Sequence, residues 1–541
     1  MCFEGGKIRH SFAFIIWMTV LAAYPWSSIK GQPRTRANDP NGPLLSEAAR
    51  SVSARDFAHA KVLVGKVLST APRSVEGHTI AGIIAVEQND LNEAVHHFAL
   101  SAKLSPRSPE THNNYGAALV RLKRPAEAAK EFVASLAINP RQPSALINLS
   151  QIRFDENTPV SLGEAKNLLT RAKALVPDRE VLRALVLTDL RLNAKADAAA
   201  DFQDYFRSDP SSNIDQRVEM GALLAEKGLY KESIQELEKV IQADPQNVLA
   251  MISLARAYLG IKDIRSAGRL LETAVSNGAN DARLYAALAD VYEAGGYYEN
   301  AIPAMRRAVE TDKLNEGYRY RYGMLLVDSK APAAAVIRLK ESVAEFPATA
   351  RLWLGLGIAQ YYESKLADAQ QSLEHALKLE PKLFPAIAYL AAIKNVGGES
   401  AESVSLYERA LNINGNNAAL HYLLANTLLK DASAVPARIE QNLRRAIELD
   451  PSLASAYLDL GTLYVRQNRL VEAAAAFEKG VSLEPGRAEA YYQLGQVYGR
   501  LKKGEASRTA LARFKELSDK QKAQTKNDYS ALVRRLANVT F

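Results

Sequence analysis

Apolar and polar residues recur along the chain at a fixed interval of 34 residues. The stretch AYLDLGTLY occupies positions 456–464 and AYYQLGQVY occupies 490–498, and both place apolar residues at helical spacing. After the first stretch, RQNRL at 466–470 interrupts the pattern, and a second apolar stripe then runs to Pro485. Proline lacks the helical N–H and disfavours helix at the preceding residue. The unit 454–487 is therefore predicted to be two amphipathic helices joined by a short turn.

The same unit recurs over most of the chain. Most intervals between residues that end a second helix are 34 residues or close to it. Proline occupies this place at Pro72, Pro106, Pro140, Pro177, Pro210, Pro245, Pro347, Pro381, Pro451 and Pro485, and Ala279, Lys313 and Gly415 occupy it elsewhere. One unit precedes the first of these prolines and one follows the last. We therefore expect fourteen repeats between residues 44 and 521.

Small residues also keep a fixed phase. In the first helix the phase contains Gly82, Gly116, Gly221, Gly323, Gly357, Gly461 and Gly495. In the second helix it contains Ala60, Ala94, Ala128, Ala165, Ala198, Ala267, Ala301, Ala335, Ala369 and Ala473. We expect the two helices to cross where these residues meet, with large side chains filling the space beside them. Gly228, Gly296, Gly398 and Asn468 share a later phase that suits a left-handed turn after the first helix.

A 34-residue period with this pattern of residues resembles the tetratricopeptide repeat family. In 454–487 the matching residues are Tyr457, Leu460, Gly461, Tyr464, Ala473, Phe477 and Pro485, and in 350–383 they are Trp353, Leu356, Gly357, Ala369, Leu373, Ala376 and Pro381. The resemblance implies an all-α fold, an α-solenoid whose helix–turn–helix repeats stack into a right-handed superhelix. A single hairpin loses about 1.5 kcal/mol per residue in conformational entropy, so neighbouring hairpins must share their apolar faces.

The family resemblance also implies a binding surface. In such proteins the first helix of each repeat lines a concave face that binds partner proteins or peptides. By phase, the residues predicted to face it are Arg283, Asp290, Tyr320, Arg351, Tyr361, Tyr492 and Gln496. The segment EGYRYRYG at 316–323 is the densest cluster, with Tyr322 expected in the core and Tyr320 and Arg321 at the surface. Tyrosine and arginine dominate binding hot spots. The alternative interpretation is an ordinary solvated helix face.

Two specialised uses of such repeats are not matched. We find no Lys/Asn/Arg set of the kind that clamps a terminal carboxylate in chaperone-binding repeats. Asn114 and Asn148 fit the asparagine ladder of O-GlcNAc transferase repeats, but Asp459, Gln493 and Gly355 depart from it. The pattern therefore favours neither use.

Signatures of catalysis and of metal binding are lacking in the sequence. It has no GxSxG, HExxH or P-loop motif, and the GLG at 355–357 lies inside a predicted helix. Five of the eight histidines are His59, His78, His96, His97 and His112, but no cysteine lies near them and their spacing is not that of a ligand set. We predict no enzyme activity, no cofactor and no metal site.

The distribution of charge along the chain argues against binding to nucleic acid. The net charge is +8, but residues 1–43 hold five basic and two acidic groups and residues 500–541 hold eleven basic and four acidic groups. The repeats between them are therefore close to neutral, whereas a nucleic-acid reader concentrates its positive charge on the binding body.

The first residues are typical of an export signal. Lys7 and Arg9 precede the apolar run SFAFIIWMTVLAAY at 11–24, and no charge occurs from Ser11 to Ile29. Residues 1–30 are predicted to be a cleaved signal peptide or an uncleaved anchor, and residues 31–43 a flexible linker. Because the positive residues stay in the cytoplasm, both alternatives place the repeats outside it, in the periplasm or secreted, with an uncleaved signal anchored in the inner membrane.

The last residues form a basic tail, 522–541. Within it, YSALVRRLANV at 529–539 regains helical spacing, which predicts a short helix that caps the final repeat. The alternative is a free basic tail that touches anionic lipid or a partner. For the whole chain we predict an extracytoplasmic scaffold that binds a protein or peptide in its groove. The alternative function is envelope polysaccharide handling, with a glycan held in the same groove.

Overall fold

The computed structural model describes residues 40–208, 213–431 and 433–521. The predicted export signal, the linker up to residue 39 and the predicted capping helix lie outside the described residues. Twenty-eight helices and no strand occur in the described ranges, which corresponds to two helices in each of fourteen periods. The prediction of an all-α solenoid of fourteen repeats is therefore confirmed. No helix in these ranges is long and apolar enough to span a bilayer.

The chain divides into two units near residue 261. The amino-terminal unit consists, in its described part, of residues 40–261. Its helices are α2 (Gly42–Ser53), α3 (Phe57–Thr70), α4 (Val75–Glu87), α5 (Leu91–Leu104), α6 (Pro109–Arg121), α7 (Pro125–Ile138), α8 (Pro143–Glu156), α9 (Pro159–Leu175), α10 (Arg179–Arg191), α11 (Lys195–Ser208), α12 (Ile214–Glu226), α13 (Tyr230–Ala243) and α14 (Val248–Gly260).

The carboxy-terminal unit consists, in its described part, of residues 262–521. Its helices are α15 (Ile264–Ser276), α16 (Ala282–Ala294), α17 (Tyr298–Thr311), α18 (Glu316–Asp328), α19 (Pro332–Glu345), α20 (Ala350–Tyr362), α21 (Leu366–Leu379), α22 (Phe384–Val396), α23 (Ser400–Ile413), α24 (Ala418–Lys430), α25 (Pro436–Leu449), α26 (Ala454–Arg466), α27 (Leu470–Leu483), α28 (Ala488–Arg500) and α29 (Gly504–Gln521).

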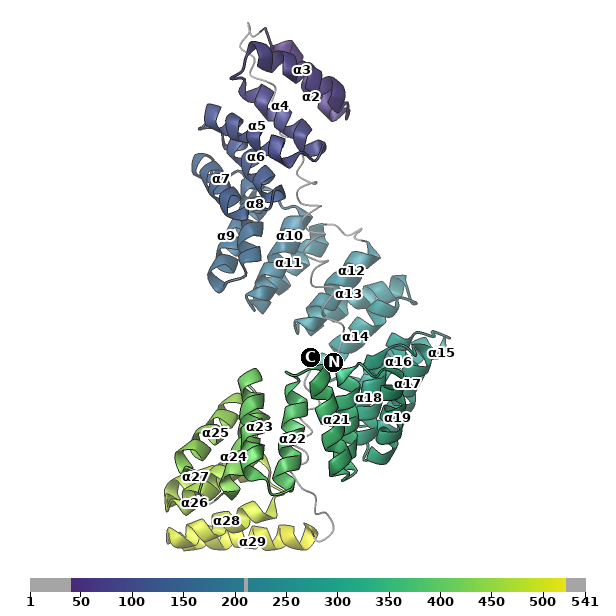
Figure 1. The fold of residues 1–541 in the computed structure, drawn as a ribbon, viewed down its shortest axis with the longest axis vertical. Helices are drawn as coiled ribbons and strands as arrows, with labels where there is room; N and C mark the ends of the chain where they lie inside the picture. The colour runs from purple at the N-terminus through teal and green to yellow at the C-terminus, as the bar shows by residue number, and fades with distance from the viewer. Residues whose placement is uncertain (1–39, 209–212, 432, 522–541) are drawn as a thin grey trace. The chain divides into compact units, whose positions relative to one another are not determined.

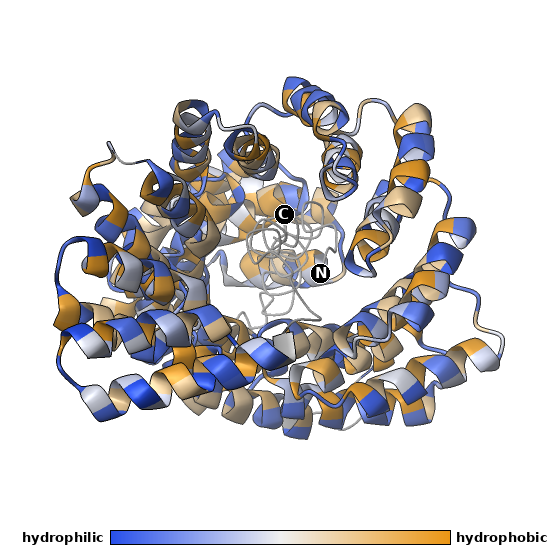
Figure 2. Ribbon diagram, turned by 90° about the horizontal axis from the view of Figure 1, so that it is seen from below, coloured by the Kyte–Doolittle hydropathy of each residue, from blue (hydrophilic) through white to orange (hydrophobic). Residues whose placement is uncertain are grey.

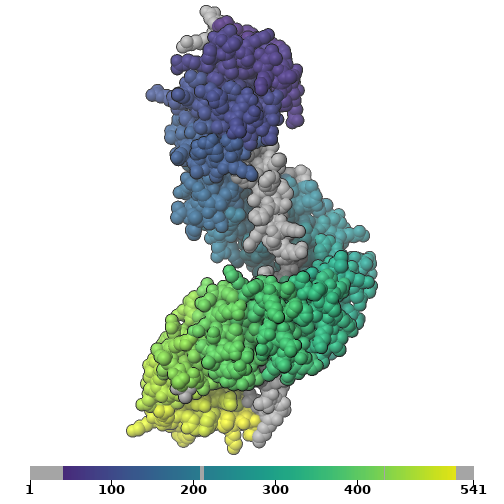
Figure 3. Space-filling model, viewed as in Figure 1, coloured from purple at the N-terminus to yellow at the C-terminus, as the bar shows by residue number. Residues whose placement is uncertain are grey.

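Within each unit the hairpins stack in two layers (Figure 1). The first helices carry even numbers, and several of them contact the first helix of a neighbouring repeat, as α6 does α8 and α20 does α22. In most repeats the second helix contacts its own first helix and the first helix that follows, as α7 does α6 and α8, and no two second helices in the described ranges make comparable contacts. The first helices therefore form one layer and the second helices the other. In the carboxy-terminal unit the hairpins pack into a continuous surface (Figure 3).

The helix crossings lie where the small residues predict them. All ten alanines of the second-helix phase are 0% exposed. A Cβ on Gly461 would lie 2.9 Å from the ring of Phe477, and one on Gly357 would lie 2.6 Å from Leu373. The same pairing of a glycine with a large side chain sixteen residues later occurs at Gly82, Gly116, Gly221, Gly323 and Gly495. Most helices accordingly alternate hydrophobic and hydrophilic sides (Figure 2).

The turns inside the hairpins are left-handed, as predicted. Gly228, Gly296 and Gly398 have φ values of 78°, 75° and 82°, and Asn468 has a φ of 59°. In the turn after α26, the N–H of Arg469 donates to the carbonyl of Tyr464 at 2.8 Å. Such bonds satisfy helix carbonyls that would otherwise lack a donor.

A polar contact that sequence reasoning missed joins successive repeats. The fourth residue of a first helix donates to the main-chain carbonyl six residues earlier, at the residue that ends the preceding repeat. Trp353 Nε1 donates to Pro347 at 2.8 Å, and His421 Nε2 lies 3.1 Å from the carbonyl oxygen of Gly415. Further examples are His78, His112, Arg319 and Tyr457. The contact explains why polar and aromatic residues share a phase next to the core.

The fourth-residue contact fixes the proton positions of a histidine pair. Because a carbonyl only accepts, His78 carries its proton on Nε2, 3.1 Å from the oxygen of Pro72. Its Nδ1 then accepts from Nδ1 of His97, which lies 3.0 Å away. Burial, and then the neighbouring His78 and His96, lower the pKa of His97. In the folded chain His97 is therefore kept neutral.

Acid should weaken the amino-terminal unit through His97. The pKa of His97 is lower in the folded chain than in the unfolded chain, where it is about 6.5. The stability that neutral His97 contributes to the folded state is therefore complete above about pH 6.5 and is lost as the pH falls below it. Glu93 partly opposes this loss and Lys61 adds to it. Thermal melting at pH 7.5 and 5.5 should show a smaller acid shift for His97→Gln than for the wild type. Equal shifts would contradict the assignment.

Candidate functional site

Tyrosines line the first-helix layer of the carboxy-terminal unit. We name as the tyrosine face the set Tyr320 on α18, Tyr361 on α20, Tyr389 on α22, Tyr422 on α24 and Tyr492 on α28. Tyr320, Tyr422 and Tyr492 are the fifth residue of their helices and Tyr361 is the twelfth, so these four share one side of the helix. Tyr389 is the sixth residue of α22, about 100° further round, and its ring meets that of Tyr361. Four are less than 9% exposed, and Tyr492 is 41% exposed. The face is thus a row of mostly fixed rings with a free ring at one end.

Two of the predicted surface residues are buried, which corrects the prediction. Tyr320 is 3% exposed, whereas Tyr322, expected in the core, is only partly buried. Gly355 on the next first helix has no side chain, and a Cβ there would lie 3.0 Å from the ring of Tyr320. The ring therefore lies against α20, and the guanidinium of Arg351 covers it, 4.5 Å from the ring centroid.

Tyr361 is the second predicted surface residue that the structure buries. It is 8% exposed, and its ring meets those of Tyr362 and Tyr389 edge-on, with centroids 5.4 and 5.6 Å away. Edge-to-face contacts of this kind are favourable and hold the rings in place. Tyr361 therefore helps to form the floor of the face rather than a free anchor.

The predicted charged residues of α16 are paired. Arg283 is exposed, and its side chain donates to Asp281 at 2.7 and 3.0 Å. This hydrogen bond is the largest cause that lowers the pKa of Asp281. Asp290 forms an ion pair with Arg321 on the next first helix. The two pairs fix the side chains of this end of the face.

The remaining predicted residues lie together on α28. Tyr492 and Gln496 are both exposed, and the ring of Tyr492 lies 5.2 Å from that of Phe514 on α29. Arg351 is partly buried on α20. The structure therefore brings the seven predicted residues onto one helix layer, but leaves only Arg283, Tyr492 and Gln496 exposed.

A polar cluster between α24 and α26 was not among the predicted site residues. Nδ2 of Asn426 donates to Oδ2 of Asp459 at 2.9 Å and lies 3.5 Å from the hydroxyl of Tyr422. Burial raises the pKa of Asp459. Burial and then the charge of Asp459 raise the pKa of Tyr422, which stays a neutral phenol. Next to this cluster, Arg487, which immediately precedes α28, donates to the hydroxyl of Ser455 on α26 at 3.2 Å.

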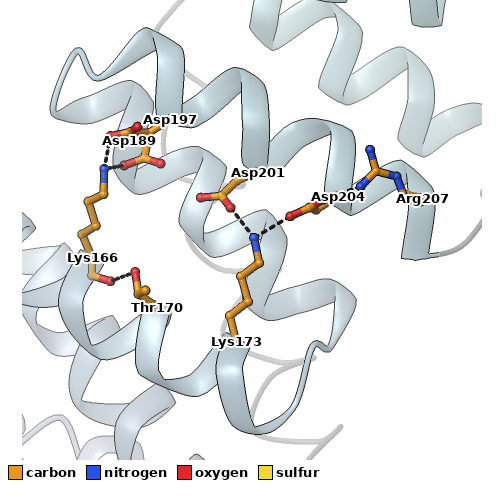
Figure 4. A network of polar contacts seen from close by, with 8 residues as sticks. All are labelled: Lys166, Thr170, Lys173, Asp189, Asp197, Asp201, Asp204 and Arg207. Carbon is orange, nitrogen blue, oxygen red and sulfur yellow. Dashed lines mark hydrogen bonds and ion pairs between the residues drawn. The ribbon is translucent and has the colours of Figure 1, made fainter.

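A second network of charged side chains, in the amino-terminal unit, is paired internally (Figure 4). Nζ of Lys166 lies 2.7 Å from Asp189, which is fully buried, and 2.5 Å from Asp197. Lys173 on the same helix lies 2.7 and 2.6 Å from two aspartates of α11. Burial raises the pKa of Asp189. Because each lysine is shared between two carboxylates, this network joins α9, α10 and α11 rather than marking a binding site.

The second-helix layer contains a cavity of about 900 Å³ between α23 and α25. Three arginines line it, and each is already paired: Arg438 with Glu408, Arg444 with Glu440 and Arg445 with Glu448. Within the described ranges no group of three or more His, Cys, Asp or Glu side chains is arranged to hold a metal ion. The tyrosine face and the cluster beside it are therefore the candidate site.

Comparison with known families gives one consistent result. Three family models, each described as a tetratricopeptide repeat, match the sequence. One matches residues 81–143, 436–488 and 458–521, the second matches 224–291 and the third matches 282–313. Comparison with curated proteins gives no match.

Several solved structures are similar in fold. Yeast Tom70 is 15% identical with a TM-score of 0.39, over 85% of this chain and 94% of that one. Cut9 in the APC/C hetero-tetramer Cut9–Hcn1 is 14% identical with a TM-score of 0.37, over 79% and 96%. YrrB, described as a TPR protein with an unusual peptide-binding site, is 21% identical with a TM-score of 0.30, over 36% and 97%.

Proposed function

Because the chain belongs to the tetratricopeptide repeat family, we propose that it is a non-catalytic scaffold whose tyrosine face binds an extended segment of a partner protein. The observation that carries this proposal is the row of five tyrosines along the first helices of the carboxy-terminal unit. Four of the rings are held by packing before any partner arrives, so binding does not have to order them.

Polar groups beside the rings supply what an extended segment needs. A bound main chain presents N–H and carbonyl groups at regular intervals, and each must find a partner when it leaves water. Gln496 and the exposed Gln493 both donate and accept, and the partly buried Asn426, whose Nδ2 contacts Asp459 and Tyr422, has spare acceptor capacity on its amide oxygen. The ring of Tyr492, which is 41% exposed, supplies contact area at low entropic cost, and the four buried rings hold the shape of the surface. The face combines both kinds of contact.

Photo-crosslinking from the two layers tests this proposal. We expect p-benzoylphenylalanine in place of Tyr492 to form adducts with a partner protein in cells. The matched control replaces Val471, which is 70% exposed on the second helix α27 and should form few adducts. Mass spectrometry of the adduct shows whether the captured molecule is a protein or a polysaccharide. Polysaccharide adducts at position 492 would support the alternative function, and equal capture at both positions would contradict the proposal.

We also propose that the scaffold works outside the cytoplasm. The support is the sequence of residues 1–30, in which two positive residues precede an uncharged apolar run. Alkaline phosphatase fused after Gly42 should be active, and changing Lys7 and Arg9 to Glu should reduce its activity. A fusion that is active only with a cytoplasmic reporter enzyme would overturn this location.

A further inference from the structure

One carboxylate beside the tyrosine face has no cation paired with it. Among the described residues, Asp459 on α26 makes no ion pair within 4 Å, and its printed contacts are to neutral groups of α24. Asp290, on the same helix layer, is paired with Arg321. Asp459 also remains partly exposed, so a group from outside can reach it.

The surroundings of Asp459 make its charge costly. Asn426 donates to Oδ2 at 2.9 Å, and the buried Tyr422 lies beside both side chains. The two nearest cations act over a longer range, because Arg487 is hydrogen-bonded to Ser455 and Lys430 is exposed at the end of α24. A carboxylate removed from water without a paired cation disfavours its charged form.

A neutral residue of the same shape exists at the corresponding place in other repeats. Asp459 is the sixth residue of α26, and the sixth residues of α6 and α8 are Asn114 and Asn148. Asn148 also contacts the preceding first helix, where it donates to Asn113, the fifth residue of α6, at 3.3 Å, whereas Asp459 accepts from Asn426, the ninth residue of α24. The sixth position of a first helix therefore tolerates an amide side chain, although α26 of the carboxy-terminal unit has a carboxylate there. Packing alone does not require the negative charge of Asp459.

We propose that Asp459 is a subsite for a positively charged side chain, lysine or arginine, of the segment that the tyrosine face binds. The proposal rests on the proposed function and adds the chemistry of the partner. The incoming ammonium or guanidinium donates to the carboxylate oxygen that Asn426 does not occupy. The phenol of Tyr422 flanks this position and contributes an aromatic neighbour, which cations favour. The partner segment therefore carries a basic residue in register with α26.

A peptide array is the test. The probes are random-sequence decapeptides that contain one Lys, Arg, norleucine or citrulline at a fixed position and no other charge. The full chain should bind its best Lys or Arg peptides about tenfold more tightly than their neutral counterparts, as expected for a partly desolvated ion pair. Asp459→Asn should reduce that ratio to near one. Asp368→Asn is the control, because Asp368 is exposed on the second helix α21 rather than on the first-helix layer, and it should preserve the ratio.

Melting temperature separates binding from a structural role. If Asp459 serves a partner, Asp459→Asn should melt at the same temperature as the wild type or higher, because a costly charge is removed. A lower melting temperature with an unchanged Lys preference would overturn the subsite and leave the tyrosine face standing. Absence of any peptide binding by the wild type would instead overturn the proposed function, and with it the subsite.

Discussion

Replacing Ala473 by tryptophan should unfold the repeat formed by α26 and α27. Ala473 is 0% exposed, one turn before Phe477, whose ring fills the space over Gly461. An indole at this crossing has no room, and overfilling a packed core costs about 1–3 kcal/mol, with larger costs for larger additions. Hydrogen exchange of the full chain should show loss of protection over 454–487, because repeats of a solenoid depend on their nearest neighbours.

Ala475 provides the matched control for this substitution. It lies on the same helix two residues further on, and it is exposed. Ala475→Trp should change the free energy of unfolding by no more than about 0.5 kcal/mol, as is usual for surface positions. If both tryptophan variants kept full protection over 454–487, the assignment of the alanine phase to the helix crossing would be wrong.

Two glycine-to-alanine substitutions should have opposite signs. In an open helix position alanine is more favourable than glycine by about 1 kcal/mol. Gly163, inside α9, has nothing within 4 Å of the position a Cβ would take, so Gly163→Ala should stabilise the chain. At Gly357 a Cβ would lie 2.6 Å from Leu373 and 3.2 Å from the carbonyl oxygen of Ala369. Gly357→Ala should therefore destabilise it, by about 1–3 kcal/mol.

Hydrogen exchange measures each substitution in its own repeat, 143–176 for Gly163 and 350–383 for Gly357. The pair tests whether close helix approach, rather than helix propensity, explains the glycine phase. Stabilisation by both substitutions would show that α20 and α21 have room for a methyl group. Destabilisation by both would mean that α9 is packed on a side that the structure leaves open.

The repeat architecture could be predicted because its causes are local and recur every 34 residues. Glycine and alanine phases, left-handed turns and terminal prolines each constrain a few neighbouring residues, and fourteen copies make the pattern plain. The structure confirms the phases at Gly461 and Ala473 and the turn at Asn468.

The directions of individual tyrosines could not be predicted in this way. Tyr320 and Tyr322 differ by about 200° around the same helix, and both directions meet other helices. Tyr320 is buried because Gly355 leaves room for its ring and Arg351 covers it, and both residues belong to the next repeat. The sequence of a single repeat therefore does not determine which way its tyrosine side chains point.

The cluster at Asp459 did have a signal in the sequence. Asn426 and Asp459 are 33 residues apart, and Asn113 and Asn148 are 35 apart, so each pair is separated by about one repeat. Residues separated by one period lie on adjacent first helices, and polar residues at that spacing can therefore meet. Reading the first helices in register, rather than one at a time, would have found both pairs.

The central claim is that a partner segment lies along the first helices of the carboxy-terminal unit. Hydrogen–deuterium exchange of the chain alone and with the partner captured at position 492 tests it most directly. Binding should slow exchange in the first helices α18, α20, α22, α24, α26 and α28. Exchange in the second helices α19, α21, α23, α25 and α27 should stay unchanged. Protection confined to the second helices, or to the amino-terminal unit, would contradict the claim.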